Sequence, residues 1–78
     1  MRTKIEGDTR KAWSYVAPLL RRKKFGITRP EFRDMLVDEG LSPGKASSLR
    51  RRLSDLVVLE HLVESGERRA GAAVLKLA

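Results

Sequence analysis

Apolar side chains recur at i, i+3, i+4 and i+7 in three segments of the chain, which is the spacing of one face of a helix. This pattern predicts helices over residues 9–24, 29–39 and 43–58. The residues expected on their buried faces are Trp13, Val16, Ala17, Leu20, Phe32, Met35, Leu36, Ala46, Leu49, Leu53, Leu56 and Val57. Pro18 lies within the first segment, where its missing N–H should kink the helix or divide it in two.

Residues suited to helix ends flank these segments. Gly26 can supply a left-handed end to the first helix, and Thr28 with Glu31 has the spacing of a capping box at the start of the second. Ser42 followed by Pro43 places a side-chain acceptor and a residue of preset φ at the start of the third. We therefore expect three separate helices with short connections.

The connection between the second and third predicted helices is especially short. Only Gly40 and Leu41 lie between the second helix and the Ser42 cap. A turn of this length that contains glycine is typical of a helix-turn-helix unit.

After residue 58 the apolar period changes from 3.6 toward 2, which is the period of a strand. We expect two short strands, over residues 62–65 and 73–78, within a β-hairpin that spans residues 61–78. Between the strands, Arg68 and Arg69 would lie at the tip of a glycine-bounded loop.

The order helix, short strand, helix, turn, helix, hairpin resembles the winged helix-turn-helix superfamily of DNA-binding domains over residues 9–78. The most similar stretch is LSDLVVLEHLVESGERRAG, residues 53–71, which resembles the end of a recognition helix, a turn and a basic wing. Many such domains have glycine where His61 stands, because the chain leaves the helix there with positive φ. The resemblance implies a mainly α fold with a small β-hairpin (α+β), a three-helix winged helix-turn-helix with recognition helix 43–58, after a flexible tail over residues 1–8.

Positive charge is concentrated in two parts of the chain. The 78 residues include 17 Lys and Arg against 10 Asp and Glu, and the net charge of +7 favours a polyanionic partner. Seven Lys or Arg and no acid lie between Arg10 and Pro30, and four and no acid lie between Leu41 and Ser54. This segregation predicts a basic face, although surface charge that only keeps the protein soluble is the alternative.

Composition argues against several classes of site. There is no cysteine and one histidine, His61, so disulfides and the usual Cys/His zinc sites are excluded, and we expect His61 to be a structural turn residue. Ser47 and Ser48 have no base within their helix, and no phosphate loop or paired acids occur, so we expect no enzyme activity, cofactor or metal. The absence of cysteine, of a secretory signal and of a long apolar run predicts a cytoplasmic protein without a membrane partner.

The resemblance implies that the third helix enters the major groove of double-stranded DNA. We expect base contacts from Ser47, Ser48 and Arg51, on an outer face that the helical period also assigns to Asp55. The residues predicted to contact the DNA backbone or to act from the wing are Arg29, Gly44, Lys45, Arg50, Arg52, Arg68 and Arg69.

The expected function is that of a small transcriptional repressor or accessory regulator of bacterial, phage or plasmid type. A winged-helix protein-interaction module and a structured-RNA binder stay open as alternatives. An acid-free stretch over residues 41–54 favours nucleic acid over a protein partner. An RNA binder would depend on the wing, because the major groove of A-form RNA is too narrow for a helix.

Simpler explanations exist for each basic cluster. Residues 50–52 and 68–69 are also compatible with solvated surface, and residues 21–24 with charges that complement the helix dipole. The chain ends directly after its last predicted strand, so a homodimer would use the first helix or a strand edge, with a monomer as the alternative. No ligand-binding domain is attached, and we expect no small-molecule ligand.

Overall fold

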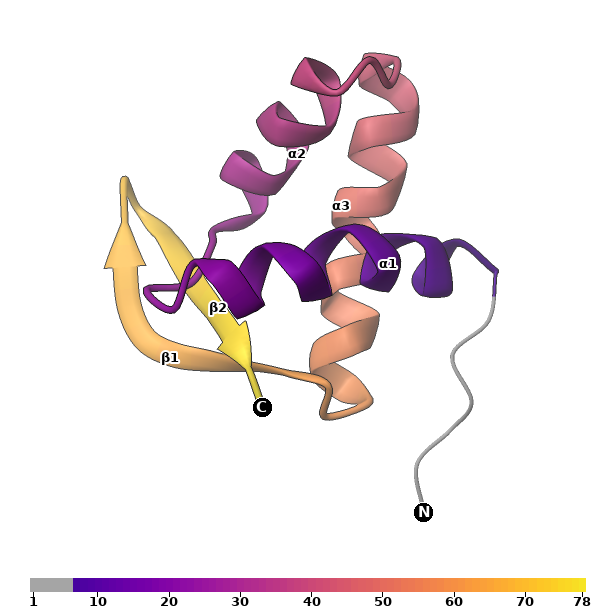
Figure 1. The fold of residues 1–78 in the computed structure, drawn as a ribbon. Helices are drawn as coiled ribbons and strands as arrows, with labels where there is room; N and C mark the ends of the chain where they lie inside the picture. Colours follow the sequence, from indigo (N-terminus) through magenta and orange to yellow (C-terminus); the bar gives the residue numbers. More distant parts are fainter. Residues whose placement is uncertain (1–6) are drawn as a thin grey trace.

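The computed structural model describes residues 7–78, a part of the chain that consists of three helices and an antiparallel hairpin (Figure 1). In chain order the elements are α1 (Gly7–Arg22), α2 (Arg29–Asp38), α3 (Pro43–Val58), β1 (Leu62–Arg69) and β2 (Ala72–Leu77). In Figure 1, α1 crosses α3, and α2 runs from the hairpin toward the N-terminal end of α3. The predicted α+β class is therefore confirmed. None of the helices between residues 7 and 78 combines the length and apolar character that a bilayer crossing requires.

The bounds of α1 differ from the prediction at both ends. The helix begins at Gly7 and ends at Arg22, whereas the apolar period predicted residues 9–24 after a tail over residues 1–8. Its first turn contains no apolar side chain, which explains why periodicity placed the start too late. The rest of the predicted tail, residues 1–6, lies outside the described residues.

Pro18 does not divide α1, which continues without interruption across it. Pro18 and Ser14 both lie on the exposed side of the helix, where water can satisfy the Ser14 carbonyl that proline leaves unpaired. The residues that hold both halves of the helix against the core are Ala12, Val16, Ala17, Leu19 and Leu20.

The predicted caps of α2 and α3 are confirmed. The Glu31 N–H donates to Thr28 Oγ1 (3.3 Å) and the Thr28 N–H donates to Glu31 Oε1 (2.9 Å), which completes the capping box. At the start of α3, the Lys45 N–H donates to Ser42 Oγ (3.3 Å), and Pro43 occupies the first helical position. Both helices therefore begin where a side chain satisfies a free backbone donor.

One apolar core lies between the helices and the hairpin. The inner stripe of α3 forms its centre, where Leu49, Leu53 and Leu56 are each no more than 1% exposed. The other members of the cluster are Ala12, Val16, Leu19, Leu20, Ile27, Phe32, Leu36, Ala46, Leu62 and Leu75. The predicted core residues that are only partly buried are Trp13, Met35 and Val57. The helical period thus predicted most of the core, and the remainder comes from Ala12 and Leu19 of α1, from Ile27, and from Leu62 and Leu75 of the hairpin.

The first strand of the hairpin is longer than predicted, and the turn is tighter. β1 continues to Arg69 and β2 starts at Ala72, so only Ala70 and Gly71 form the turn. Both turn residues have positive φ, +52° and +80°, as a type I′ turn requires. Arg68 and Arg69 therefore lie in β1, and their predicted position at the tip of a loop is wrong.

A bulge allows β1 to continue past Glu64, near its predicted end. The register pairs Glu64 with Leu75 and next Arg68 with Ala73, so three residues of β1 oppose a single residue of β2. Gly66, within the bulge, has φ +87°, a conformation that costs glycine little. Gly66 therefore lies in a bulge within β1 and does not begin the glycine-bounded loop that the sequence predicted.

The turn after α3 corrects another prediction. The resemblance placed positive φ at His61, but Glu60 has it, with φ +66°. The His61 N–H instead donates to the Leu56 carbonyl (3.0 Å), and its ring packs against Trp13 with centroids 5.2 Å apart. His61 therefore contributes to packing between α1 and the base of the hairpin.

The segment between α1 and α2 attaches the hairpin to the helices. Ile27 and Leu75 exchange two backbone hydrogen bonds, of 2.9 and 2.8 Å, and so form the short extended piece expected before α2. Gly26 has φ +84°, and a Cβ there would lie 2.6 Å from both the Leu75 carbonyl oxygen and Val74 Cγ1. Only glycine permits both this φ and this close approach.

We expect Gly26→Ala to lower the free energy of unfolding more than Gly66→Ala does. The two glycines have similar φ, +84° and +87°, but a Cβ at Gly66 meets no atom within 4 Å. The additional loss at Gly26 should be about 1–3 kcal/mol, the usual cost of overpacking, and urea denaturation measures it. Equal losses would show that the close approach of Gly26 to β2 is unimportant.

Candidate nucleic-acid interface

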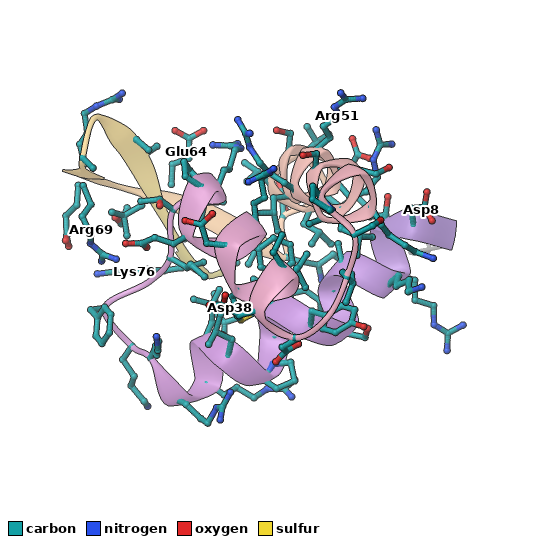
Figure 2. All side chains as sticks on the ribbon, turned by 90° about the horizontal axis from the view of Figure 1, so that it is seen from above. Asp8, Asp38, Arg51, Glu64, Arg69 and Lys76 are labelled. Atoms are coloured by element: carbon teal, nitrogen blue, oxygen red, sulfur yellow. The ribbon has the colours of Figure 1, made fainter. Side chains whose placement is uncertain are left out.

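The outer faces of α2 and α3 border an open polar groove of about 440 Å³. The residues that line it are Arg29, Ser47, Arg50, Arg51 and Ser54. Three of them are cations and none is an acid. Figure 2 shows Arg51 on the side of α3 that faces away from α1. The structure thus brings four of the predicted contact residues together and adds Ser54.

Two hydrogen bonds join α2 to α3 along this groove. Arg29 Nη2 donates to Ser54 Oγ (3.2 Å), and Arg33 Nε donates to Ser47 Oγ (3.0 Å). The two arginines are four residues apart and therefore lie on one face of α2. Because the capping box at Thr28 determines where α2 begins, it also places Arg29 in the first turn, within reach of α3.

The sequence analysis missed Arg33 and Ser54. Arg33 pairs with a residue 14 positions away on another helix, a separation that leaves no periodic signal. Ser54, in contrast, follows Ser47 by two helical turns, so the period could have found it. Both enlarge the polar surface that α2 and α3 share.

The six other predicted contact residues lie outside the groove, and three of them belong to the first two turns of α3. Ser48 is half-buried on α3, and Gly44 is exposed with no atom within 4 Å of a Cβ, so the backbone there is open to approach. The Lys11 ammonium can donate a hydrogen bond only to the neutral amine of Lys45 and repels its charged form, so both effects lower the pKa of Lys45 below its usual range. Lys11 of α1 thus adds a second cation near the start of α3, and the sequence analysis missed it as well.

Arg52 and Asp55 interact with each other and with α1. Arg52 Nη1 lies 3.0 Å from Asp55 Oδ2, and Thr9 Oγ1 of α1 donates to the same oxygen (3.2 Å). Asp55 points away from the core as predicted, with its side chain 45% exposed, but the Thr9 hydroxyl on the neighbouring helix holds its carboxylate toward α1. Arg52 remains a predicted phosphate contact, but its charge is partly neutralised.

Arg69 connects the hairpin to the start of α2. Its Nη1 donates to both carboxylate oxygens of Glu31, at 2.7 and 3.0 Å, and its Nη2 donates to the Phe25 carbonyl (3.1 Å). The guanidinium also lies over the Phe25 ring, 5.4 Å from its centroid. Arg68, in contrast, is exposed, and its side chain makes one hydrogen bond among the described residues, to the Gly71 carbonyl of the turn. The two adjacent arginines thus have different surroundings.

These contacts determine the ionisation of Glu31. Partial burial alone would raise the pKa of Glu31, but the hydrogen bonds from the Thr28 backbone and from Arg69, with the Arg69 charge, outweigh it and hold the pKa below its usual range. The carboxylate is therefore stabilised in the folded protein, where it serves α2 and the hairpin together.

Comparisons of the chain with protein-family models, with curated proteins and with solved structures give no match. The geometry of the described residues therefore carries the assignment of the site. Between residues 7 and 78, no three His, Cys, Asp or Glu residues form a group that could hold a metal ion. The groove offers cationic and hydroxyl groups, which suit a ligand with many anionic oxygens.

We expect Glu31→Gln to lower stability near neutral pH but not in acid. Glutamine can preserve the capping box through its carbonyl oxygen, so the variant removes the carboxylate charge next to Arg69 and the N-terminus of α2, together with one of the two oxygens that accept from Arg69. Because the pKa of Glu31 is lowered on folding, its charge stabilises the fold above the ordinary value of 4.5, and this contribution is lost as the pH falls through the lowered pKa. With both side chains more than a third exposed, the difference near neutral pH should be about 0.5–1 kcal/mol.

Urea denaturation at a series of pH values measures this difference. Glu67→Gln is the matched control, because it breaks the Lys76–Glu67 pair of the same hairpin (3.1 Å), whose carboxylate is 61% exposed. A difference between wild type and Glu31→Gln that stays constant down to strong acid would contradict the assignment.

Proposed function

We propose that this protein binds double-stranded DNA, with α3 in the major groove and the hairpin against the adjacent backbone or minor groove. The groove between α2 and α3 carries this proposal, because three arginines converge there and no acid lines it. Converging cations repel one another, and the phosphates of a nucleic acid relieve this repulsion with release of bound counterions. A major groove about 12 Å wide also accommodates a helix.

Arg51 and Ser47 are the strongest candidates for base contacts. Both lie in the first ten residues of α3, and Arg51 is exposed with a fork that matches the O6 and N7 acceptors of guanine. Ser47 Oγ accepts from Arg33, so its own hydroxyl hydrogen stays available for a base acceptor. Ser48 remains a predicted base contact at the edge of this surface.

Phosphate contacts would surround these two residues. Arg29 and Arg50 line the same groove, and Lys45 lies at the N-terminal end of α3, where the Gly44 backbone is uncovered. Arg68 is the exposed cation of the hairpin and would reach the neighbouring backbone. Arg52 is paired with Asp55, and Arg69 is paired with Glu31. Because an acid already offsets part of their charge, we expect both arginines to contribute less to DNA binding.

Such a protein would act by occupying a DNA site, as a small transcriptional repressor or accessory regulator in the cytoplasm, associated with the nucleoid when bound. Because the groove lies on α3, the proposal favours duplex DNA over structured RNA, whose narrow major groove does not admit a helix. Its acid-free lining also favours nucleic acid over the surface of a partner protein.

We expect selection from a pool of random-sequence duplexes to enrich a motif, with affinity that falls steeply as salt rises. On that motif, Arg51→Ala should lose about 1–3 kcal/mol of discrimination against a changed base pair. Arg29→Ala, the matched control from the same groove, should weaken all duplexes alike and reduce the salt slope by about 1. Titrations of each variant with matched and changed duplexes measure both effects.

Each other outcome of this experiment is informative. An Arg51→Ala variant with unchanged site preference would show that Arg51 does not contact a base. Salt-sensitive binding without an enriched motif would indicate an architectural or RNA-directed role, and no binding at low salt would favour a protein-interaction module. Twofold symmetry in the motif would indicate a homodimer.

A further inference from the structure

A second basic surface lies at the C-terminal end of α1. A hollow of about 420 Å³ opens there, and its lining residues are Leu20, Arg21, Lys23, Lys24, Lys76 and Leu77. The cations come from two segments that are distant in sequence, the end of α1 and strand β2. The two leucines form an apolar floor beneath them. No acid lines the hollow, so this surface repeats the charge pattern of the groove on α3.

Helix-dipole compensation does not account for this cluster. The C-terminus of a helix carries roughly half a negative charge, and Arg21 and Arg22 in the last turn already exceed it. Lys23 and Lys24 follow the end of the helix, and Lys76 is supplied by the hairpin. Of the cations that line the hollow, only Lys76 has an ion pair within the described residues, with Glu67 (3.1 Å). Several positive charges are therefore left for an external anion.

The backbone of this surface is ordered before any ligand binds. The Lys23 N–H donates to the Leu19 carbonyl (2.8 Å), and the Gly26 N–H donates to the Lys23 carbonyl (3.2 Å). Leu19 is buried, and Gly26 is packed against β2. A ligand would therefore meet cations on a fixed backbone and would pay a small entropic cost to order it.

The two basic surfaces lie on different sides of the molecule. In Figure 2, Arg51 projects from α3 at one edge of the molecule, whereas α1 runs along the opposite edge. Lys76 projects from the hairpin at the side of the molecule, away from Arg51. A single straight duplex in contact with α3 would therefore leave the end of α1 uncovered.

From this arrangement we infer that the protein holds two DNA segments at once. One segment contacts the groove of α2 and α3, and the phosphate backbone of a second segment contacts the hollow lined by Arg21, Lys23, Lys24 and Lys76. The lining of the hollow has no hydroxyl or amide side chain that could read a base edge. Within the described residues no side-chain hydrogen bond holds the Arg21 fork in place, so we expect this contact to be made to phosphates and not to depend on sequence. The inference rests on the proposed function for the α3 side only.

A bridging assay with the full chain tests this inference. One random-sequence duplex is fixed to beads, a second labelled duplex is free in solution, and the labelled duplex retained by the protein is measured at low salt. We expect Lys23→Ala/Lys24→Ala to reduce retention by about tenfold, because each phosphate contact contributes to a strongly salt-dependent affinity. The same variant should bind a single duplex in solution within about twofold of wild type.

Arg10→Ala/Arg22→Ala is the matched control. It also removes two positive charges, in this case from α1, and neither residue lines the hollow. We expect this control to retain the labelled duplex as wild type does. If both double variants lose retention equally, net charge and not the hollow is responsible, and the inference is wrong.

The remaining outcomes separate this inference from the proposed function. Wild-type protein that binds a single duplex but retains no second one overturns the bridging inference and leaves the proposed function intact. Retention that persists in Lys23→Ala/Lys24→Ala overturns it too, because a dimer with two α3 surfaces would then form the bridge. If Lys23→Ala/Lys24→Ala loses single-duplex binding while Arg51→Ala does not, the α3 interface itself is wrong.

Discussion

The structure depends on the division of α3 into two faces. Its inner stripe of Leu49, Leu53 and Leu56 is almost fully buried, and α1, α2 and β1 all pack on this helix. A chain of 78 residues without cysteine is close to the size at which an apolar core alone is sufficient. Each buried leucine contributes about 1.5–3 kcal/mol. The same 3.6-residue period leaves the outer face to arginine and serine, so the positions of α3 that stabilise the fold differ from those open to a ligand.

The position of the hairpin depends on two contacts of different character. Ile27 and Leu75 pair through their backbones, next to a glycine that permits the close approach. Arg69 and Glu31 pair through their side chains, and Glu31 also caps α2. One carboxylate thus links the start of the helix that borders the groove to the strand that would flank a bound duplex. The charge on Arg69 therefore serves mainly to position the hairpin, whereas its neighbour Arg68 is open to solvent.

Local signals in the sequence predicted the elements that depend on local physics. Helical period and the caps at Thr28 and Ser42 located α2 and α3 well, because capping satisfies backbone donors within three residues. The prediction failed at features that depend on contacts distant in the chain. The bulge at Gly66 extends β1 because β2 pairs on both sides of it, and the positive φ of Glu60 arises where α3 meets the hairpin.

In the candidate site, too, local features could be predicted from the sequence and contacts between distant residues could not. The period of α3 was sufficient to place Ser47, Arg50 and Arg51 on one surface, since a single helix determines their relation. It could not show which cations are paired with an acid or hydrogen-bonded to residues distant in the chain. Arg69 donates to Glu31, which is 38 positions away in the sequence, and Arg33 donates to Ser47, which is 14 positions away. Neither separation corresponds to a helical or strand period.

The distribution of free cations over two sides of the molecule has a physical consequence for ligand binding. At physiological ionic strength, exposed charges separated by more than about 8 Å are largely screened from each other. The molecule measures 34 × 29 × 21 Å along its principal axes, so charges on opposite sides are several screening lengths apart. An anion bound at α3 therefore neither strengthens nor weakens a second one at the end of α1 by direct electrostatic interaction. The two basic surfaces therefore act as separate local fields, and under the proposed function a polyanion at one would bind independently of a polyanion at the other.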